Sequence, residues 1–243
     1  MDASQDLDGR VALVADGADG IGRAVTDRLL AAGAQVAVST RNQPDELPAG
    51  ARWFGADVRE PDEADALVAA VVEHHGRLDV VVTGPGGSPA AEAATASPTF
   101  TTAIVTLNLL APLWVSRAAN EVLQGQADGG AIVHLGPLDG LGASPGTAAY
   151  GAAKAGLVHL TQSLAVEWAP RVRVNCVSAG HLGTGRTEAA AVPLQRLGTA
   201  ADVAEAVVYL ASPASSYVSG ANLVLHGGGE RPAFLDAVEG QQP

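Results

Sequence analysis

Val11-Ala12-Leu13-Val14-Ala15 runs directly into Asp16-Gly17-Ala18-Asp19-Gly20-Ile21-Gly22, and this stretch decides the fold. The first five residues are apolar and predict a buried β-strand. Ile21–Ala32 follows with the apolar spacing of a helix that ends at Gly33. In a glycine-rich turn from strand to helix, backbone N–H groups can approach the phosphates of a dinucleotide. The stretch therefore predicts the first unit of an α/β protein with a phosphate-binding turn.

The rest of the chain repeats this alternation of short strands and longer helices. Further strands are predicted at Gln35–Ser39, Leu78–Thr83, Ala131–Leu135, Arg171–Val177 and Asn222–Leu225. Further helices are predicted at Asp62–Glu73, Phe100–Asn120, Ala148–Ala169 and Ala201–Ala211. Pro112 should kink its helix or lie where a hydrogen bond is dispensable. The alternation predicts a parallel sheet with helices on both faces.

Length and composition limit the classes of protein that this chain can be. Its 243 residues, of which 47% are hydrophobic, suit a single domain over residues 1–243, with Glu230–Pro243 as a loose tail. Arg41–Gly50 and Gly84–Pro98 are rich in small residues and proline, and are expected to be surface loops. A net charge of −12 argues against nucleic-acid binding, which needs clustered Lys and Arg.

The sequence also predicts the cellular compartment of the protein. No uncharged apolar run of membrane-spanning length is expected, and the N-terminus lacks the apolar core of a signal peptide. The single cysteine, Cys176, excludes an intrachain disulfide. A cytoplasmic protein is therefore predicted.

One lysine stands out against the arginine-rich background. The basic residues are 13 arginines and Lys154 alone. Lys154 follows Tyr150 by four residues on a predicted helix, so both side chains share one face. An ammonium beside a phenol favours the phenolate and lowers the tyrosine pKa, which makes it a usable general acid or base nearer neutral pH. An arginine would keep the charge but not the compact ammonium donor.

The chain resembles the short-chain dehydrogenase/reductase family over nearly its whole length. The matching pieces, in order, are Gly20-Ile21-Gly22-Arg23-Ala24, Asp57-Val58, Asn108, Tyr150-Gly151-Ala152-Ala153-Lys154-Ala155-Gly156, Arg173-Val174-Asn175, Thr184, Arg196-Leu197-Gly198 and Gly227-Gly228. The resemblance implies a doubly wound, Rossmann-type domain with a seven-stranded parallel sheet. It also implies a nicotinamide cofactor, a small-molecule substrate and a homo-oligomer, either a tetramer or a dimer.

The resemblance assigns a role to each matching residue. Tyr150 would exchange a proton with the substrate oxygen, Lys154 would also hold the nicotinamide ribose, and Asn108 would bind a water that relays protons to the lysine. The residues implied in cofactor binding are Gly17, Gly20, Ile21, Gly22, Asp57, Val58, Lys154 and Thr184. Asp57 would contact the adenine, Val58 would pack on it, and Thr184 would bind the carboxamide. His181, beside this segment, is a weaker candidate for a substrate contact.

The end of the second strand favours one cofactor over the other. An acid there would accept hydrogen bonds from the ribose 2′-hydroxyl of NAD, but the position holds Thr40. Arg41 follows and could pair with a 2′-phosphate. NADP(H) is therefore the predicted cofactor, with NAD(H) second.

Three positions depart from the family pattern. Asp16 replaces the first glycine of the turn, and Thr83-Gly84-Pro85-Gly86 replaces an Asn-Asn-Ala-Gly segment. Pro137 stands thirteen residues before Tyr150, where the family places a serine that hydrogen-bonds the substrate oxygen. Ser144 or Thr147 could substitute for that serine.

Three functions remain open from the sequence. The first is an NADP(H)-dependent oxidoreductase that reduces a carbonyl or oxidises an alcohol on a small, modestly apolar substrate. The second is a cofactor-binding or regulatory member of the fold without turnover, which the three departures favour. The third is a dehydratase or isomerase that uses Tyr150 and Lys154 as acid and base.

Overall fold

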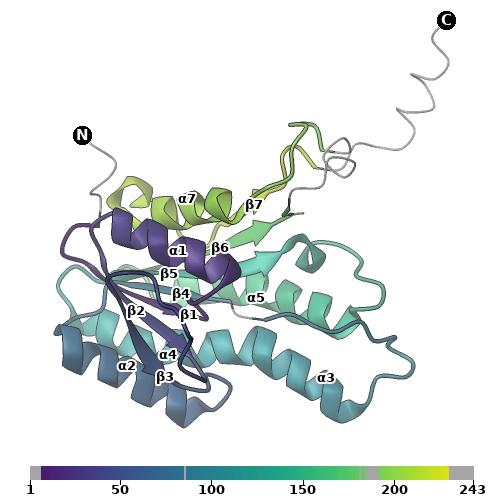
Figure 1. Ribbon diagram of the computed structural model, residues 1–243, viewed down its shortest axis with the longest axis horizontal. Coiled ribbons are helices and arrows are strands. Elements are labelled where there is room, and N and C mark those ends of the chain that lie inside the picture. Colours follow the sequence, from purple (N-terminus) through teal and green to yellow (C-terminus); the bar gives the residue numbers. More distant parts are fainter. Residues whose placement is uncertain (1–6, 85, 181, 184–191, 230–243) are drawn as a thin grey trace, which may run out of the picture.

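A seven-stranded, wholly parallel sheet forms the centre of the protein (Figure 1). The computed structural model describes residues 7–84, 86–180, 182–183 and 192–229. The spatial order is β3-β2-β1-β4-β5-β6-β7, which confirms the predicted fold class. The strands are β1 (Val11–Ala15), β2 (Gln35–Thr40), β3 (Ala51–Gly55), β4 (Val80–Thr83), β5 (Gly130–Pro137), β6 (Val172–Ala179) and β7 (Asn222–Leu225).

Helices cover both faces of the sheet (Figure 1). The main helices are α1 (Gly20–Ala31), α2 (Pro61–His75), α3 (Pro98–Val105), α4 (Ala111–Gly125), α5 (Ala148–Glu167) and α7 (Ala200–Ala211). Short turns of helix are η2 (Thr106–Leu110), η3 (Leu138–Gly140) and η4 (Pro213–Ser215). Helices α1 and α7 bury one face through residues such as Leu29 and Val207, whereas α2, α4 and α5 bury the other through Leu67, Val115 and Leu164.

Strand β3 is missing from the strands predicted residue by residue. It pairs with β2 at the edge of the sheet, and its burial pattern is mixed, with Arg52 and Gly55 exposed. An edge strand with one wet face lacks the continuous apolar run that marks the central strands. The family resemblance supplies the seventh strand that the local pattern does not.

The long helix predicted over Phe100–Asn120 is interrupted. Helix α3 passes into a π turn, η2, before α4 begins, and Pro112 lies in the first turn of α4. Proline has no N–H to continue the helical ladder, and a π turn is a typical way to absorb such a break. Pro112 thus lies where its missing N–H is dispensable, the second of the two expected outcomes, and the π turn before it contains Asn108.

The continuous segment Pro98–Gly125 corrects one expectation from the sequence. By length and composition it could cross a membrane, with a mean hydropathy of 1.4 in its most apolar window. About a third of that window (33%) is buried, and α4 packs against α2 and the sheet. A core helix of a soluble protein meets the same criterion, so this single segment is weak evidence for a membrane location.

A buried polar network fixes α5 against the sheet. His134 of β5 is fully buried, with Nδ1 2.8 Å from Thr161 Oγ1 on α5 and Nε2 3.0 Å from Ser116 Oγ on α4. Thr161 donates its own proton to the Leu157 carbonyl, so it accepts from His134 Nδ1, and Ser116 then donates to Nε2. Burial lowers the pKa of His134 to about 3, which keeps the ring neutral. The network ties three elements together and thereby places the helix that carries Tyr150 and Lys154.

Candidate active site

The candidate site lies at the carboxyl ends of the central strands. Strands β1 and β4 are neighbours, and the chain winds away from them in opposite directions toward β3 and toward β7. In open parallel sheets, ligands bind at this switch point, outside the carboxyl ends of the strands. The residues discussed below lie at or after the carboxyl ends of the strands, or on helices that pack beside them.

The turn after β1 brings α1 close to the strand end. A Cβ on Gly22 would lie 1.9 Å from the Asp16 carbonyl oxygen, so this approach requires glycine. Gly17 is similarly enclosed, and its carbonyl accepts a hydrogen bond of 2.9 Å from Thr26 Oγ1. Asp16 itself has a φ of +65°, a left-handed conformation that aspartate tolerates better than most residues. The turn thus keeps its tight geometry without the first glycine.

The start of α1 suits a phosphate group. Asp19 is the N-cap residue, but its side chain makes no capping hydrogen bond to the first turn. The N–H groups at the start of a helix carry partial positive charge and need acceptors. Gly20, with a φ of +50°, and the partly buried Ile21 open this turn. The residues present therefore fit the pyrophosphate of a dinucleotide.

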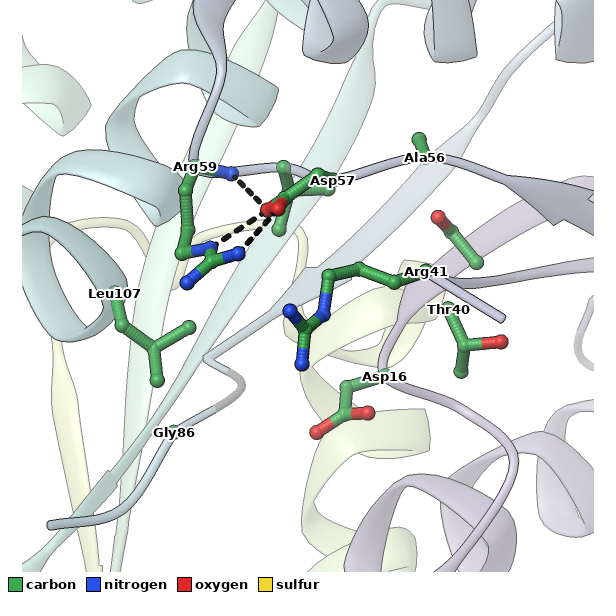
Figure 2. A pocket seen from close by; sticks show the side chains of 10 residues that line it. Asp16, Thr40, Arg41, Ala56, Asp57, Arg59, Gly86 and Leu107 are labelled. Carbon is green, nitrogen blue, oxygen red and sulfur yellow. Dashed lines mark hydrogen bonds and ion pairs between the residues drawn. The ribbon is translucent and has the colours of Figure 1, made fainter. Parts of the chain in front are cut away.

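A cavity of about 290 Å³ opens beside this turn (Figure 2). Its walls come from the ends of β1, β2 and β3, from the loop after β4 and from η2. The lining residues are Asp16, Ser39, Thr40, Arg41, Ala56, Asp57, Val58, Arg59, Gly86 and Leu107. The structure therefore brings the predicted residues Arg41, Asp57 and Val58 into one cavity.

Arg41 and Thr40 differ in whether their side chains are already bonded to other residues. The Thr40 hydroxyl accepts a hydrogen bond of 3.0 Å from Trp53 Nε1 and donates one of 2.7 Å to the Asn42 carbonyl. Arg41 is exposed and has no ion-pair partner among the described residues. The guanidinium points into the cavity (Figure 2), where it is free to bind an anion.

Asp57 is held by a residue that the sequence reasoning did not single out. Arg59 Nε donates to Asp57 Oδ1 at 2.8 Å, its backbone N–H donates to the same oxygen at 3.1 Å, and the second guanidinium nitrogen reaches Oδ2. These hydrogen bonds hold the pKa of Asp57 below its usual value. The carboxylate is thus fixed and partly neutralised within the cavity wall. A guanidinium two residues after Asp57 in the sequence was the available signal.

Asp16 brings a negative charge to the same cavity. Desolvation of its carboxylate raises the pKa of Asp16, Asp19 raises it further, and Arg41 lowers it. In Figure 2 the Asp16 carboxylate lies beside the Arg41 guanidinium, with no ion pair drawn between them. The cavity therefore presents charges of both signs side by side.

Lys154 of α5 is buried beside the ends of β4 and β5. Its side chain is 2% exposed, and Nζ donates to the carbonyl oxygens of Gly84 at 3.3 Å and Leu135 at 3.2 Å. Burial lowers the pKa of Lys154 to about 8. A Cβ on Gly140 would come within 3.1 Å of the Lys154 backbone and Cβ, so glycine lets η3 pack directly on this part of α5.

Tyr150 lies one helical turn before Lys154 and near its charge. Lys154 Nζ is 6.0 Å from the centroid of the Tyr150 ring, at the outer limit of a cation–π contact. The structure thus brings together the two residues that the sequence spacing paired. The pair consists of the only lysine in the sequence and a partly buried tyrosine.

Asn108 is buried in the π turn and faces the loop after β4. Its Nδ2 donates to the carbonyls of Ile104 at 2.9 Å and Gly87 at 3.2 Å. Its Oδ1 is buried and has no hydrogen-bond partner within the described part of the chain. A Cβ on Gly86 would lie only 2.0 Å from that oxygen, so the loop requires glycine there. Asn108 therefore anchors this loop beside the cleft.

Pro137 ends β5, and two hydroxyl groups lie nearby in sequence. Pro137 pairs with Ala179 of β6 and offers neither a hydroxyl nor an N–H. Ser144 Oγ and Thr147 Oγ1 are 2.5 Å apart at the start of α5, where Thr147 is the N-cap but makes no capping hydrogen bond. Thr184 and His181, also singled out from the sequence, lie outside the described residues.

The arrangement combines a cavity of about 290 Å³ beside the glycine-rich turn with a buried cation–phenol pair. The turn and the cavity would hold the phosphates and adenosine of a nicotinamide dinucleotide, and the Tyr150–Lys154 pair lies where acid–base chemistry would be needed. Both features lie at the carboxyl ends of strands of the same parallel sheet. This is the geometry of a dinucleotide-dependent oxidoreductase.

Comparisons with known proteins agree with this geometry. A family model described as enoyl-(acyl carrier protein) reductase matches residues 15–230. An uncharacterised oxidoreductase of Mycobacterium tuberculosis (strain CDC 1551 / Oshkosh) is 33% identical over 91% of this chain and 92% of its own length. A 3-oxoacyl-[acyl-carrier-protein] reductase of Vibrio cholerae (serotype O1) is 31% identical over 91% of this chain and 98% of its own.

Solved structures show the same similarity. A crystal structure from Sinorhizobium meliloti 1021, titled as a short-chain alcohol dehydrogenase, superposes with a TM-score of 0.83 at 30% identity, covering 92% of this chain and 97% of the other. A short-chain dehydrogenase/reductase structure from Burkholderia xenovorans gives a TM-score of 0.85 at 28% identity over the same shares. The chain therefore belongs to the short-chain dehydrogenase/reductase family of NAD(P)-using oxidoreductases.

Proposed function

We propose that the protein is an NADP(H)-dependent oxidoreductase that interconverts a carbonyl and an alcohol on a small, modestly apolar substrate. The observation that carries this proposal is Lys154, which is buried, held by two carbonyl oxygens and placed beside Tyr150. Burying an ammonium without a carboxylate partner is costly, so such a group points to a function. A surface Tyr–Lys pair would carry no such cost.

The roles of the pair follow from its chemistry. Tyr150 holds a proton at its hydroxyl and passes it to the substrate oxygen during reduction. The positive charge of Lys154 stabilises the phenolate left behind. Two of the three ammonium protons are used on backbone carbonyls, which leaves one donor for a bound ribose or water. When bound, the nicotinamide supplies the hydride.

The cavity of about 290 Å³ is where the adenosine of the cofactor would lie, and we call it the adenosine cavity. Its lining supports NADP(H) over NAD(H). Arg41 lines the cavity and has no ion-pair partner within the described part of the chain. The Thr40 hydroxyl, at the position where NAD-binding relatives are expected to carry an acid, is already occupied. A free guanidinium is well suited to a 2′-phosphate. The carboxylate of Asp57 is taken up by Arg59, so its contact with adenine would be shared with that guanidinium.

The substrate oxygen requires a donor other than the residue at position 137. Pro137 has no hydroxyl, and the Ser144–Thr147 pair, three to six residues before Tyr150, supplies the nearest alternative along the chain. In this pair one hydroxyl donates to the other, and the accepting hydroxyl keeps its own proton for another partner. The lack of the usual serine is thus proposed to alter how the substrate is polarised, and not to abolish turnover.

We further infer that the protein is a cytoplasmic homo-oligomer. Among the described residues, three large hydrophobic side chains are more than half exposed, Val166 at 80%, Leu194 at 66% and Tyr217 at 103%. Only a third of the apolar window in Pro98–Gly125 is buried. Exposed apolar surface of this kind favours association between copies. Size-exclusion chromatography with light scattering tests this: a mass near 24.3 kDa would contradict it.

A turnover assay tests the proposed activity. NADPH consumption would be followed with acetoacetyl-CoA, ethyl acetoacetate and 2,3-butanedione, the first because relatives are named 3-oxoacyl reductases. Oxidation of the product alcohols with NADP⁺ tests the reverse direction. We expect turnover by the wild-type protein and a kcat about 100- to 10,000-fold lower in Tyr150→Phe. NADPH binding without turnover in either direction would instead favour a regulatory member of the fold.

A further inference from the structure

Two opposite charges enter the adenosine cavity from neighbouring strands. Asp16 directly follows β1 and Arg41 follows β2, and these two strands pair in register up to Ala15 and Ser39. Both side chains line the cavity of about 290 Å³. Figure 2 shows the carboxylate and the guanidinium facing the same space without an ion pair between them. A ligand placed there meets both charges.

The backbone holds the Asp16 carboxylate in this position. The Asp16 N–H donates to the Ser39 carbonyl at 2.7 Å, and the Asp16 carbonyl lies against Gly22, where no Cβ fits. The left-handed φ of +65° then directs the side chain away from the strand and into the cavity. Asp16 is thus fixed at the rim, and a change of its side chain to an isosteric amide would leave this geometry intact.

Two other acceptors that line the cavity are already committed, whereas the buried Ser39 hydroxyl has no partner among the described residues. The Asp57 carboxylate accepts hydrogen bonds on both oxygens from Arg59, and the Thr40 hydroxyl is bonded to Trp53 and Asn42. Asp16 is therefore the carboxylate of the cavity that keeps acceptor capacity for a ligand. A carboxylate accepts from a hydroxyl and repels a phosphate, whereas a guanidinium binds the phosphate.

We propose that Asp16 is a second specificity-determining residue, which binds the 2′-hydroxyl of an unphosphorylated adenosine and opposes a 2′-phosphate. Arg41 favours the phosphorylated ligand and Asp16 the unphosphorylated one, so the chain binds both NAD(H) and NADP(H). The proposal rests on the proposed function, because it assumes that this cavity holds the adenosine of the cofactor. It explains why an acid occupies a turn position that a glycine would fill with less strain.

Nucleotide fragments test this without any turnover. Isothermal titration would compare 5′-AMP, 2′-deoxy-5′-AMP and 2′,5′-ADP on the wild-type protein, Asp16→Asn and Asp8→Asn. All three probes carry the same 5′-phosphate, so its interaction with Asp16 cancels in affinity ratios. Asp8 is an exposed acid at the opposite end of β1, so Asp8→Asn removes the same charge far from the cavity.

Two affinity ratios carry the result. The wild-type protein should bind 5′-AMP about fivefold more tightly than 2′-deoxy-5′-AMP, and Asp16→Asn should remove this difference. The ratio of 2′,5′-ADP to 5′-AMP affinity should rise about tenfold in Asp16→Asn and stay unchanged in Asp8→Asn. If Asp16→Asn folds poorly, Asp16→Gly suits the positive φ and serves the same purpose.

Different results would overturn the role of Asp16 and the proposed function. Equal wild-type binding of 5′-AMP and 2′-deoxy-5′-AMP, or unchanged ratios in Asp16→Asn, overturns the role of Asp16 while the proposed oxidoreductase stands. If none of the three probes, nor NADPH or NADH, binds the wild-type protein, the adenosine cavity is misassigned and both proposals fall.

Discussion

The two ends of the candidate site hold their charged groups in opposite environments. At one end Lys154 is 2% exposed and is held by two backbone carbonyls, with no carboxylate bonded to it in the described structure. At the other end Asp16 and Arg41 are exposed and lie side by side in an open cavity. Charges in a dry site interact strongly, whereas solvent screens those in a wet one. The buried end therefore determines whether chemistry occurs, and the open end adjusts which cofactor enters.

The largest effect should follow from removing the phenol at the buried end. Tyr150→Phe removes the proton donor while keeping the ring beside Lys154, so kcat should fall about 100- to 10,000-fold. NADPH affinity, measured by titration, should change little because the phenol lies outside the adenosine cavity. A Tyr150→Phe variant with wild-type kcat would show that this pair is structural.

The next effect comes from the cation at the open end. Arg41→Gln replaces the guanidinium by a shorter, neutral polar side chain, and NADPH affinity should fall about 30-fold, or about 2 kcal/mol. NADH affinity should stay within about twofold, since the lost contact is to the 2′-phosphate. Equal losses for both cofactors, measured by titration calorimetry, would refute the assignment of Arg41 to that phosphate.

The pH dependence of kcat/KM should reflect the titration of Lys154 at the buried end. Burial lowers the pKa of Lys154 to about 8, so the ammonium predominates below that pH and is lost above it. The kcat/KM for carbonyl reduction should therefore fall about tenfold between pH 7 and pH 9. Since the unfolded state keeps its proton to higher pH, this residue contributes increasing stability as the pH rises from about 8 toward 10.5. A flat kcat/KM profile over this range would contradict a catalytic role for the ammonium.

The smallest change is a gain at the end of β5, the strand whose Leu135 carbonyl binds Lys154. Pro137→Ser introduces a hydroxyl where the family places one, and carbonyl reduction should rise about fivefold, less than the full worth of an oxyanion donor because another donor already serves. Pro137→Ala restores the N–H without the hydroxyl and is the matched control. If both variants match the wild type, the residue at position 137 does not contact the substrate oxygen.

The fold was predictable because its signals are local and repeated. The central strands are fully buried apolar runs, and the helices between them show the matching periodicity. The edge strand β3 escaped detection because none of its residues is fully buried and the charged Arg52 interrupts its apolar residues. The π turn before Pro112 was equally inaccessible, because proline predicts a break but not the form that the break takes.

The site was predictable in its buried part and less so in its open part. The spacing of Tyr150 and Lys154 led directly to the observed pair. The contact between Arg59 and Asp57 depends on side-chain directions at a strand end, which no periodicity encodes. The segment Thr83–Gly86 illustrates the same limit: it departs from the family motif, yet Gly84 and Gly86 are required by close contacts to Leu135 and Asn108.

Direct titration of NADPH into the wild-type protein tests the central claim, that this cleft binds a 2′-phosphorylated nicotinamide dinucleotide. The account predicts saturable binding that is tighter for NADPH than for NADH, with a rise in melting temperature that tracks saturation. It also predicts that Arg41→Gln removes the preference and that Asp16→Asn increases it. No binding of NADPH at millimolar concentration, or tighter binding of NADH, would contradict the claim.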